Sequence, residues 1–274
     1  MPELPEVETI VADLRPHLVG RTIVRCELLF PSIVRHPSPE LFASAVAGVR
    51  IEAAGRRGKY MQFDCGSGLL LVVHLGMSGQ LRIVDATQPV EKHTHAVFTL
   101  DDGGQLRYRD PRRFGRLLLG REDELIAANK MPRLGPEPID PLFAPDQLYG
   151  RIHRRRTALK AVLLDQSAIA GVGNIYADES LHRARLRPDR PAASVSRRSA
   201  RRLHESLRDS LTIAIQNRGS SVDSYRDAWG ELGQQQERLL VYGRGGQPCY
   251  TCGRPLATIH IAGRTTVFCR RCQR

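Results

Sequence analysis

Four cysteines near the C-terminal end have the spacing of a metal site. They form the pattern Cys249-x2-Cys252-x16-Cys269-x2-Cys272. Two Cys-x2-Cys pairs can bring four thiolates into a tetrahedron around one metal ion, and structural sites of this kind bind zinc. Two disulfides are the alternative, but nothing else in the chain indicates an oxidising compartment. We therefore expect one structural Zn²⁺, with no coordination position left for water.

The N-terminus offers a nucleophile. Pro2 directly follows Met1, and removal of the initiator methionine would leave the secondary amine of proline at the chain end. An α-amine has a pKa near ~8, so a usable neutral fraction exists at neutral pH. Attack of a secondary amine on a sugar C1′ gives a permanently cationic iminium, which can drive elimination of the phosphates. The alternative is that Pro2 and Pro5 only stiffen an extended start.

Glu3 and Glu6 flank this amine. Carboxyl groups donate and accept protons in catalysis when burial moves their pKa toward neutrality. Acidic residues in the first turn of a helix also complement the helix dipole without any catalytic purpose. The residues alone leave both interpretations open.

The net charge of +12 is unevenly distributed. Residues 1–150 hold 18 Lys and Arg against 19 Asp and Glu, whereas residues 151–274 hold 23 against 10. A basic second half favours a polyanionic partner, because each neutralised phosphate releases counterions. Lys160 is the only lysine after position 150, so arginine dominates and planar phosphate recognition is plausible. A charge that serves only solubility, or a general bias toward arginine, would give the same count.

Two kinds of element must position these residues. Apolar side chains from Val7 to Leu18 recur at helical spacing, which predicts an amphipathic helix over residues 3–18. Short apolar runs separated by Gly, Asp and Ser then predict a β-sandwich or barrel over residues 22–120. The expected strands are residues 23–30, 61–65, 69–75, 81–84, 96–100, 106–109 and 117–119, with a hairpin turn at 101–104.

The second half has a helical pattern. Three prolines within residues 131–138 predict an interdomain linker, and residues 218–237 are polar and weakly periodic, which predicts a loop. No apolar run is long enough for a membrane helix and no signal peptide precedes the first helix, so we expect a soluble cytoplasmic protein. The expected helices are residues 145–153, 157–166, 174–184 and 195–216.

Several motifs together resemble the bacterial formamidopyrimidine-DNA glycosylases. The chain begins Met1-Pro-Glu-Leu-Pro-Glu-Val-Glu-Thr9, and the four-cysteine hairpin closes it. The resemblance extends over nearly the whole chain. It implies an α+β multidomain fold: an N-terminal β-sandwich with an N-terminal helix, then a helical helix-two-turn-helix domain and a four-cysteine zinc finger hairpin. The expected parts are a catalytic domain at 2–130, a linker at 131–144, the helical domain at 145–238 and the zinc finger at 239–274. The further matching motifs span residues 56–60, 74–79, 110–115, 134–138, 171–176 and 241–244.

The resemblance also implies an activity. Members of this family excise oxidised purines, such as 8-oxoguanine and formamidopyrimidines, from double-stranded DNA in base excision repair and then cut the abasic strand by β- and δ-elimination. By position, Pro2 is the Schiff-base nucleophile, Glu3 the acid that assists sugar-ring opening, and Glu6 a supporting carboxylate. Lys59 is the proton donor for β-elimination and Arg264 the donor for δ-elimination. Without the resemblance, Lys59 would belong to a solvated basic cluster and Arg264 would be a phosphate contact at a hairpin tip.

Chemistry on a base requires that its nucleotide be flipped out of the duplex, and the gap must be filled. Met77, Arg112 and Phe114 resemble the family residues that fill it, since an apolar wedge holds the stack open while arginine bonds the orphaned base. The alternatives are a core position for Met77 and a buried loop anchor for Phe114. His93 and His95 could also form a metal pair, although the family uses neither as a ligand. The expected phosphate contacts are His93, Arg112, Arg155 or Arg156, Lys160, Asn174 and Arg264.

Two other functions stay open. One is a zinc-ribbon DNA-binding protein that has the fold but no activity, and intact Pro2, Glu3, Lys59 and Arg264 argue against it. The other is the related endonuclease-VIII-like branch, which prefers oxidised pyrimidines and typically opens Pro-Glu-Gly-Pro-Glu; Leu4 favours the purine branch. We expect a monomer, because the lesion site needs only one copy of the protein, and an association with the bacterial nucleoid. Residues 219–221 correspond to the loop that contacts the lesion, where serine stands in place of the usual threonine.

Overall fold

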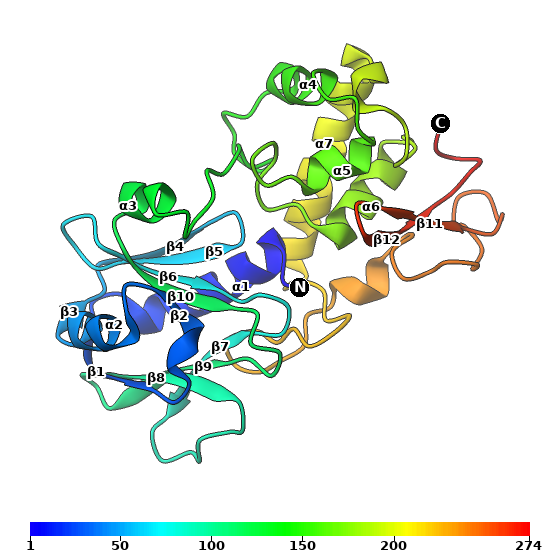
Figure 1. Cartoon of the computed structure of the whole chain (residues 1–274). Helices are drawn as coiled ribbons and strands as arrows, with labels where there is room; N and C mark the ends of the chain where they lie inside the picture. Colours follow the sequence, from blue (N-terminus) through cyan, green and yellow to red (C-terminus); the bar gives the residue numbers. More distant parts are fainter. The chain divides into compact units, whose positions relative to one another are not determined.

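A computed structural model describes residues 1–274, and the chain divides into two compact units (Figure 1). The first unit comprises residues 1–133 and 217–236, and the second comprises residues 134–216 and 237–274. The division after Arg133 lies in the proline-rich stretch. The segment 217–236 lies with the first unit, although it follows the last long helix of the second half. None of the helices is both long and apolar enough to cross a membrane.

The first unit is built on two five-stranded sheets, as the short apolar runs predicted. One sheet has the strand order β3-β1-β8-β9-β7 and the other β2-β10-β6-β5-β4. Neighbouring strands are antiparallel except for the parallel pair β2 and β10. The strands are β1 (Thr22–Leu28), β2 (Val34–His36), β3 (Val49–Arg50), β4 (Ala53–Arg57), β5 (Tyr60–Asp64), β6 (Leu70–His74), β7 (Gln80–Asp85), β8 (Thr94–Leu100), β9 (Gly104–Arg109) and β10 (Arg116–Gly120).

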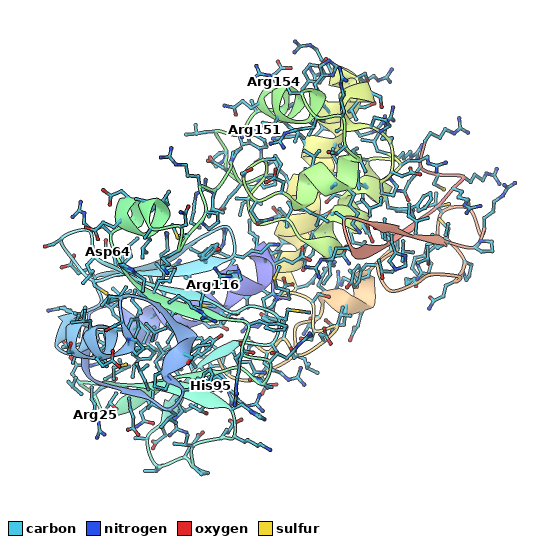
Figure 2. All side chains as sticks on the ribbon, viewed as in Figure 1. Arg25, Asp64, His95, Arg116, Arg151 and Arg154 are labelled. Atoms are coloured by element: carbon cyan, nitrogen blue, oxygen red, sulfur yellow. The ribbon has the colours of Figure 1, made fainter.

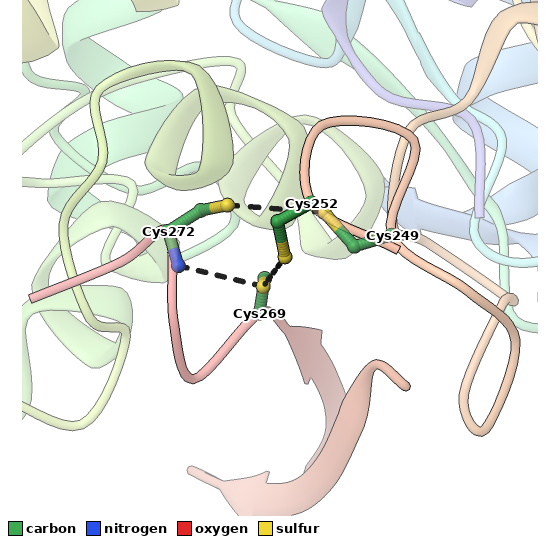
Figure 3. A group of neighbouring side chains, drawn as sticks. All are labelled: Cys249, Cys252, Cys269 and Cys272. Atoms are coloured by element: carbon green, nitrogen blue, oxygen red, sulfur yellow. Dashed lines mark hydrogen bonds between the residues drawn. The ribbon is translucent and has the colours of Figure 1, made fainter. Parts of the chain in front are cut away.

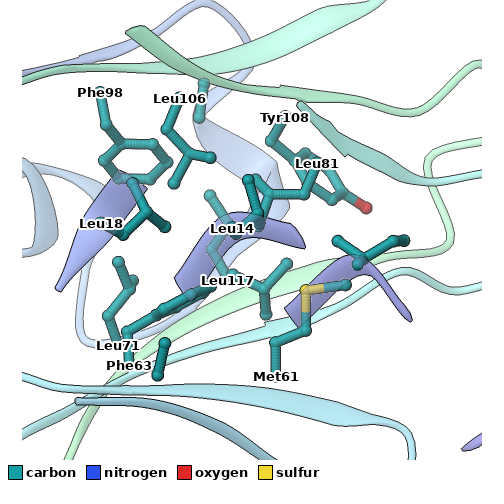
Figure 4. Packing of buried hydrophobic residues seen from close by; sticks show 14 of the residues in the cluster. Leu14, Leu18, Met61, Phe63, Leu71, Leu81, Phe98, Leu106, Tyr108 and Leu117 are labelled. Atoms are coloured by element: carbon teal, nitrogen blue, oxygen red, sulfur yellow. The ribbon is translucent and has the colours of Figure 1, made fainter. Parts of the chain in front are cut away.

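Helix α1 (Leu4–Leu18) is enclosed by the two sheets. Figure 4 shows Leu14 and Leu18 of α1 between Phe98 of one sheet and Leu71 of the other. All four side chains are fully buried and belong to the core of this unit. Each such side chain contributes roughly 1.5–3 kcal/mol relative to its exposed state. The helix is therefore firmly fixed, and so is the start of the chain that precedes it.

The sequence pattern did not predict two short helices and three short strands of this unit. Helix α2 (Pro39–Val46) interrupts the stretch that was expected to be entirely β. Ser38 caps it, since its Oγ accepts the Leu41 N–H at 3.3 Å, and Pro39 occupies the first turn, where no N–H is needed. Only Phe42 and Val46 are buried, so the helical period is too short to recognise. The other missed elements are α3 (Glu122–Ala127), β2, β3 and β4.

The second unit is helical and ends in a small hairpin, as predicted. In α7 (Arg197–Gln216) the spacing of Leu203, Leu207 and Leu211 by four places all three on the buried face. Strands β11 (Ala257–Ile261) and β12 (Arg264–Phe268) are antiparallel. Their two-residue turn has positive φ at both Ala262 and Gly263, the geometry that suits the twist of a hairpin. The helices are α4 (Pro145–His153), α5 (Leu159–Leu164), α6 (Asn174–Arg183) and α7 (Arg197–Gln216). Short 3₁₀ turns occur at Pro31–Ile33, Ala192–Ser194 and Gln235–Arg238.

The segment 217–236 is largely irregular, in agreement with the predicted loop, but side chains of the first unit anchor it. The Arg218 guanidinium lies 2.6 Å from Asp13 of α1 and also bonds Asp227 within the segment. Tyr225 is buried in the core, and its hydroxyl donates to the Arg218 carbonyl at 3.1 Å. In addition, the Ser220 N–H donates to Glu6 at 2.7 Å, which fixes the segment beside the N-terminal part of α1.

His74, at the end of β6, makes stability depend on pH. Its Nδ1 accepts the Gly76 N–H at 3.2 Å, so the ring is neutral. Burial, aided by the charges of Arg116 and Lys59, lowers the pKa of His74 from 6.5 to about 3. The unfolded chain therefore binds a proton between these values that the folded chain does not. The folded protein therefore has its full stability with respect to His74 above about pH 6.5. Its free energy of unfolding decreases as the pH falls toward 3.

We expect His74→Asn to lose less unfolding free energy on acidification than the wild type, because the asparagine Oδ1 can accept the same N–H without titrating. The side chain keeps some exposed surface, so the difference should be below the ~1.4 kcal/mol per pH unit of one transferred proton. Urea unfolding at about pH 7 and about pH 4.5, on either side of the upper pKa, measures it. Equal losses in the two proteins would contradict the assignment.

Candidate functional site

The start of α1 places three of the predicted site residues together. Pro2 is buried behind an exposed Met1, and Glu3 and Glu6 are 2% and 1% exposed. Glu6 Oε2 accepts the Glu3 N–H at 2.8 Å, while its Oε1 accepts the Ser220 N–H at 2.7 Å. Glu6 thus joins the helix start to the anchored segment. Gly219 is required there, because φ is +76° and a Cβ would lie 2.9 Å from Glu6 Cγ.

Lys59 lies in the tight turn between β4 and β5, where Arg57 pairs with Tyr60. Gly58 provides the positive φ of 58° that this turn requires. Lys59 is only 6% exposed. Its neighbour Arg56 is also largely buried, and its Nε lies 2.7 Å from Glu8 Oε2 on α1. A solvated basic cluster is therefore excluded, and the turn is attached to the helix that carries Pro2.

Two loops of the first unit present the predicted wedge. Arg112 and Phe114 are exposed, and the Arg112 guanidinium carbon lies 5.0 Å from the centroid of the Phe114 ring. Met77 is half-buried on the loop after β6. The two loops touch closely, because a Cβ on Gly76 would lie 2.5 Å from the Phe114 backbone carbon. With 53% of its surface exposed, Phe114 is not a buried loop anchor.

Asp110 holds these loops in place, a role that its motif did not reveal. Its carboxylate is fully buried and accepts bonds from Ser78 Oγ at 2.6 Å and from Gly115 N–H at 2.8 Å. It also accepts the Arg112 N–H at 3.2 Å, and its carbonyl oxygen lies 2.7 Å from His95 Nε2. The Nε2 of His95 is thereby used structurally, which argues against a metal pair with His93.

We expect Asp110→Ala to disorder the wedge loops, since it leaves buried donors without an acceptor at a cost of roughly 1–3 kcal/mol each. The ratio of affinities for abasic-site DNA and undamaged DNA should fall, while Asp64→Ala, on β5, should leave it unchanged. Fluorescence anisotropy with the two duplexes measures this ratio. An unaltered ratio in a folded Asp110→Ala protein would show that the carboxylate does not organise the loops.

The predicted phosphate contacts lie in both units. His93 is partly exposed with φ of 70°, and Asn174 begins α6 and donates to the Thr265 carbonyl at 3.1 Å. Arg155 and Arg156 are both exposed, and Arg155 lies 3.4 Å from Asp165. Figure 2 shows the neighbouring arginines Arg151 and Arg154 at the end of α4, in the same basic part of the chain.

The structure contradicts the phosphate contact predicted for Lys160. The sequence predicted a phosphate contact, but the side chain has no exposed surface and its Nζ lies 2.7 Å from Asp178 Oδ1 and 2.8 Å from Thr266 Oγ1. Burial raises the pKa of Asp178 to about 6, although the ammonium opposes that shift. Lys160 is therefore the buried half of an ion pair that joins α5, α6 and β12. Its charge was counted with the basic surface because the partner on α6 is not recognisable in the sequence.

The four cysteines converge on one point, as Figure 3 shows. Their sulfur atoms all lie within 4.8 Å of one another, and all four are free of disulfides. Four thiolate donors at this separation fit one structural Zn²⁺. The remaining Cys26 and Cys65 lie elsewhere, and burial raises the pKa of Cys26 to about 12 and that of Cys65 above its ordinary value, so neither is a reactive thiolate.

Arg264 is exposed and is the first residue of β12, directly after the hairpin turn. The cysteine cluster lies at the other end of the same strand, since Cys269 follows Phe268. The metal site thus supports a two-stranded arm that presents arginine at its tip. Its own apolar core consists of only five buried residues, Val241, Cys249, Leu256, Val267 and Cys269.

Three family models match the chain in order. The formamidopyrimidine-DNA glycosylase N-terminal domain matches residues 1–117, and the H2TH domain of the same glycosylases matches residues 134–226. The zinc finger found in FPG and IleRS matches residues 246–274. The first two agree with the sandwich and the helical domain, and the third with the four-cysteine hairpin.

Relatives that match over the full length of the chain indicate the same family as the three models. The formamidopyrimidine-DNA glycosylases of Desulforamulus reducens and Geobacillus kaustophilus are 44% and 45% identical over 275 residues, covering all of this chain and 99% and 100% of theirs. The crystal structure of MutM (Fpg) from Thermus thermophilus has a TM-score of 0.89 at 43% identity, covering 99% of this chain and 98% of that one. The Lactococcus lactis Fpg in complex with abasic-site DNA has a TM-score of 0.91 at 36% identity, covering 99% of both chains. With its buried N-terminal proline, its paired sheets and its four-cysteine hairpin, this chain belongs to the formamidopyrimidine-DNA glycosylase family.

Proposed function

We propose that this chain excises oxidised purines from double-stranded DNA and then cleaves the abasic strand, with Pro2 as the nucleophile. The position of Pro2 carries the proposal. Its nitrogen, which becomes a free secondary amine once Met1 is removed, lies at the start of a helix that is fixed within the core, next to the buried carboxyl group of Glu3. An amine held in this way can be aimed at a sugar C1′ with little loss of freedom, which is a large part of what an enzyme contributes to a bimolecular step.

In the first step, the Pro2 nitrogen bonds to C1′ of the damaged nucleotide. The bond between C1′ and the base breaks, and the base takes up the proton that the Pro2 amine loses. The bond between C1′ and O4′ then breaks as O4′ takes a proton from Glu3, and the sugar ring opens. The product is an iminium between Pro2 and C1′. Because proline is a secondary amine, this iminium has no N–H proton to lose and stays cationic.

In the second step, the cationic iminium acidifies the C2′ proton. Loss of that proton expels the 3′-phosphate, and a further elimination expels the 5′-phosphate. Lys59 serves the first elimination and Arg264 the second as proton donors, while Glu6 holds the start of α1 through its bonds to residues 3 and 220. Water finally releases Pro2 from the sugar remnant.

The remaining predicted site residues bind the duplex. Met77 and Phe114 enter the gap left by the flipped nucleotide, and Arg112 bonds the orphaned base. His93, Asn174 and one of Arg155 and Arg156 contact phosphates, together with Arg264. The Lactococcus lactis relatives were crystallised with DNA that contains Fapy-dG or an abasic site, which supports this class of substrate. We propose that the chain acts as a monomer on DNA in the cytoplasm.

The choice between purine and pyrimidine lesions is tested with two duplexes that differ only in the damaged base pair. We expect single-turnover excision of 8-oxoguanine opposite cytosine to be much faster than excision of thymine glycol opposite adenine. A strong preference for thymine glycol would instead assign the chain to the endonuclease-VIII-like branch. Binding of both duplexes without excision of either would favour a non-catalytic DNA-binding protein.

A further inference from the structure

One face of α6 contacts the zinc-binding hairpin along its whole length. Asn174, Asp178 and His182 are spaced by four residues, so their side chains lie along the same face of the helix. Asn174 Nδ2 donates to the Thr265 carbonyl at 3.1 Å, and Asp178 Oδ2 accepts the Val267 N–H at 3.0 Å. The third member of the row contacts the cysteine cluster, because His182 Nε2 lies 3.7 Å from Cys249 Sγ.

The surroundings of His182 determine which ring nitrogen carries the proton. The side chain is 6% exposed, and its Nδ1 is buried without a hydrogen-bond partner. A buried N–H without an acceptor is rarer and more costly than a buried lone pair without a donor. The geometry therefore places a ring proton on Nε2, where it is directed at the sulfur of Cys249.

We propose that His182 donates a hydrogen bond from its Nε2–H to the Cys249 thiolate and thereby stabilises the zinc bound by the four cysteines. Four thiolates around Zn²⁺ would leave a net negative charge on the site. One donated hydrogen bond withdraws electron density from the Cys249 sulfur, which makes this ligand less basic and less reactive toward oxidants and electrophiles. The proposal concerns metal retention and is independent of the glycosylase chemistry proposed above.

The bond also orients the ligand. Cys249 lies in the loop before β11, 67 positions along the chain from His182, and the ring connects this loop to α6. Hydrogen-bond partners of metal ligands typically contribute about 10–100-fold to metal affinity or activity. A change of this size is measurable without any assay of DNA cleavage.

The test uses the zinc-loaded full-length protein and three variants. His182→Phe retains a ring of similar volume but has no donor, whereas His182→Gln retains an N–H close to the position of Nε2. His153→Phe makes the same chemical change at an exposed site on α4 and is the matched control. Zinc release is followed with a chromophoric chelator, with and without hydrogen peroxide. We expect release from His182→Phe to be at least about tenfold faster, with His182→Gln and His153→Phe close to the wild type.

Cobalt substitution separates a hydrogen bond from simple packing. In the Co²⁺-loaded protein, loss of the donor should raise the energy of the sulfur electrons and move the sulfur-to-cobalt charge-transfer band to longer wavelength. His182→Gln should restore the wild-type band. Wild-type release and an unshifted band in His182→Phe would overturn the proposal. It would equally fail if His182→Gln and His182→Phe released zinc equally fast with the wild-type spectrum, because the ring would then act by its shape alone.

Discussion

Replacement of Glu3 by glutamine should almost abolish excision of 8-oxoguanine while largely preserving cleavage at a preformed abasic site. Opening the sugar ring of an intact nucleotide needs a proton on O4′, which the amide cannot supply. An abasic site already exists partly as the open aldehyde, so the Pro2 amine can attack it without this acid. General acid catalysis contributes roughly 10²–10⁴-fold, and we expect a loss of that size in excision.

Single-turnover assays on the two substrates measure the ratio of these activities. Glu8→Gln is the matched control, because Glu8 also lies on the first turns of α1 but pairs with Arg56. It should change neither rate by more than a few-fold. Equal losses on both substrates in Glu3→Gln would indicate that the carboxyl group only supports the helix start, which its place at the N-terminal end of α1 would also allow.

Removal of zinc should abolish specific binding to lesion DNA. The hairpin that carries Arg264 has a core of only five buried residues, too few to fold without a further constraint. A structural zinc supplies on the order of 10–16 kcal/mol to such a site. We therefore expect chelation to unfold residues 249–272 while the two sheets of the first unit stay intact.

Anisotropy with abasic-site DNA and circular dichroism on the same samples test this expectation. Binding should fall by at least about 100-fold and return when Zn²⁺ is added back, with the β signal unchanged. Metal-free protein that still nicked lesion DNA would show that the hairpin does not depend on the ion.

The sequence was sufficient to predict the elements whose characteristic residue spacing lies within one continuous segment of the chain. Helix α7 has apolar residues spaced by four, the hairpin of β8 and β9 has its Asp and Gly turn, and the four cysteines have paired spacing. These predictions are confirmed. Helix α2 was not predicted, because two buried residues do not establish a helical periodicity.

The partners of buried polar groups could not be predicted, because they are distant in sequence. Glu6 bonds Ser220 across 214 positions, and the Asp178 carboxylate bonds the N–H of Val267, 89 positions away. Lys160 was misassigned for this reason, since nothing in its own segment indicates that Asp178 neutralises it. His182 likewise resembles an ordinary helical residue until the fold places Cys249 beside it. The chemistry-bearing residue types were recognisable in the sequence, whereas the residues that hold them in position were not.

The central claim is that the amine of Pro2 forms a covalent bond with the sugar. Borohydride reduces such an iminium to a stable amine, so it traps protein on a duplex with one 8-oxoguanine opposite cytosine. The decisive comparison is between protein with Met1 removed and protein with a retained N-terminal extension. We predict a trapped complex only with free Pro2, and peptide mapping should find the sugar on that residue. Trapping of neither form, while both still bind the duplex, would contradict the account and leave a DNA-binding protein without this chemistry.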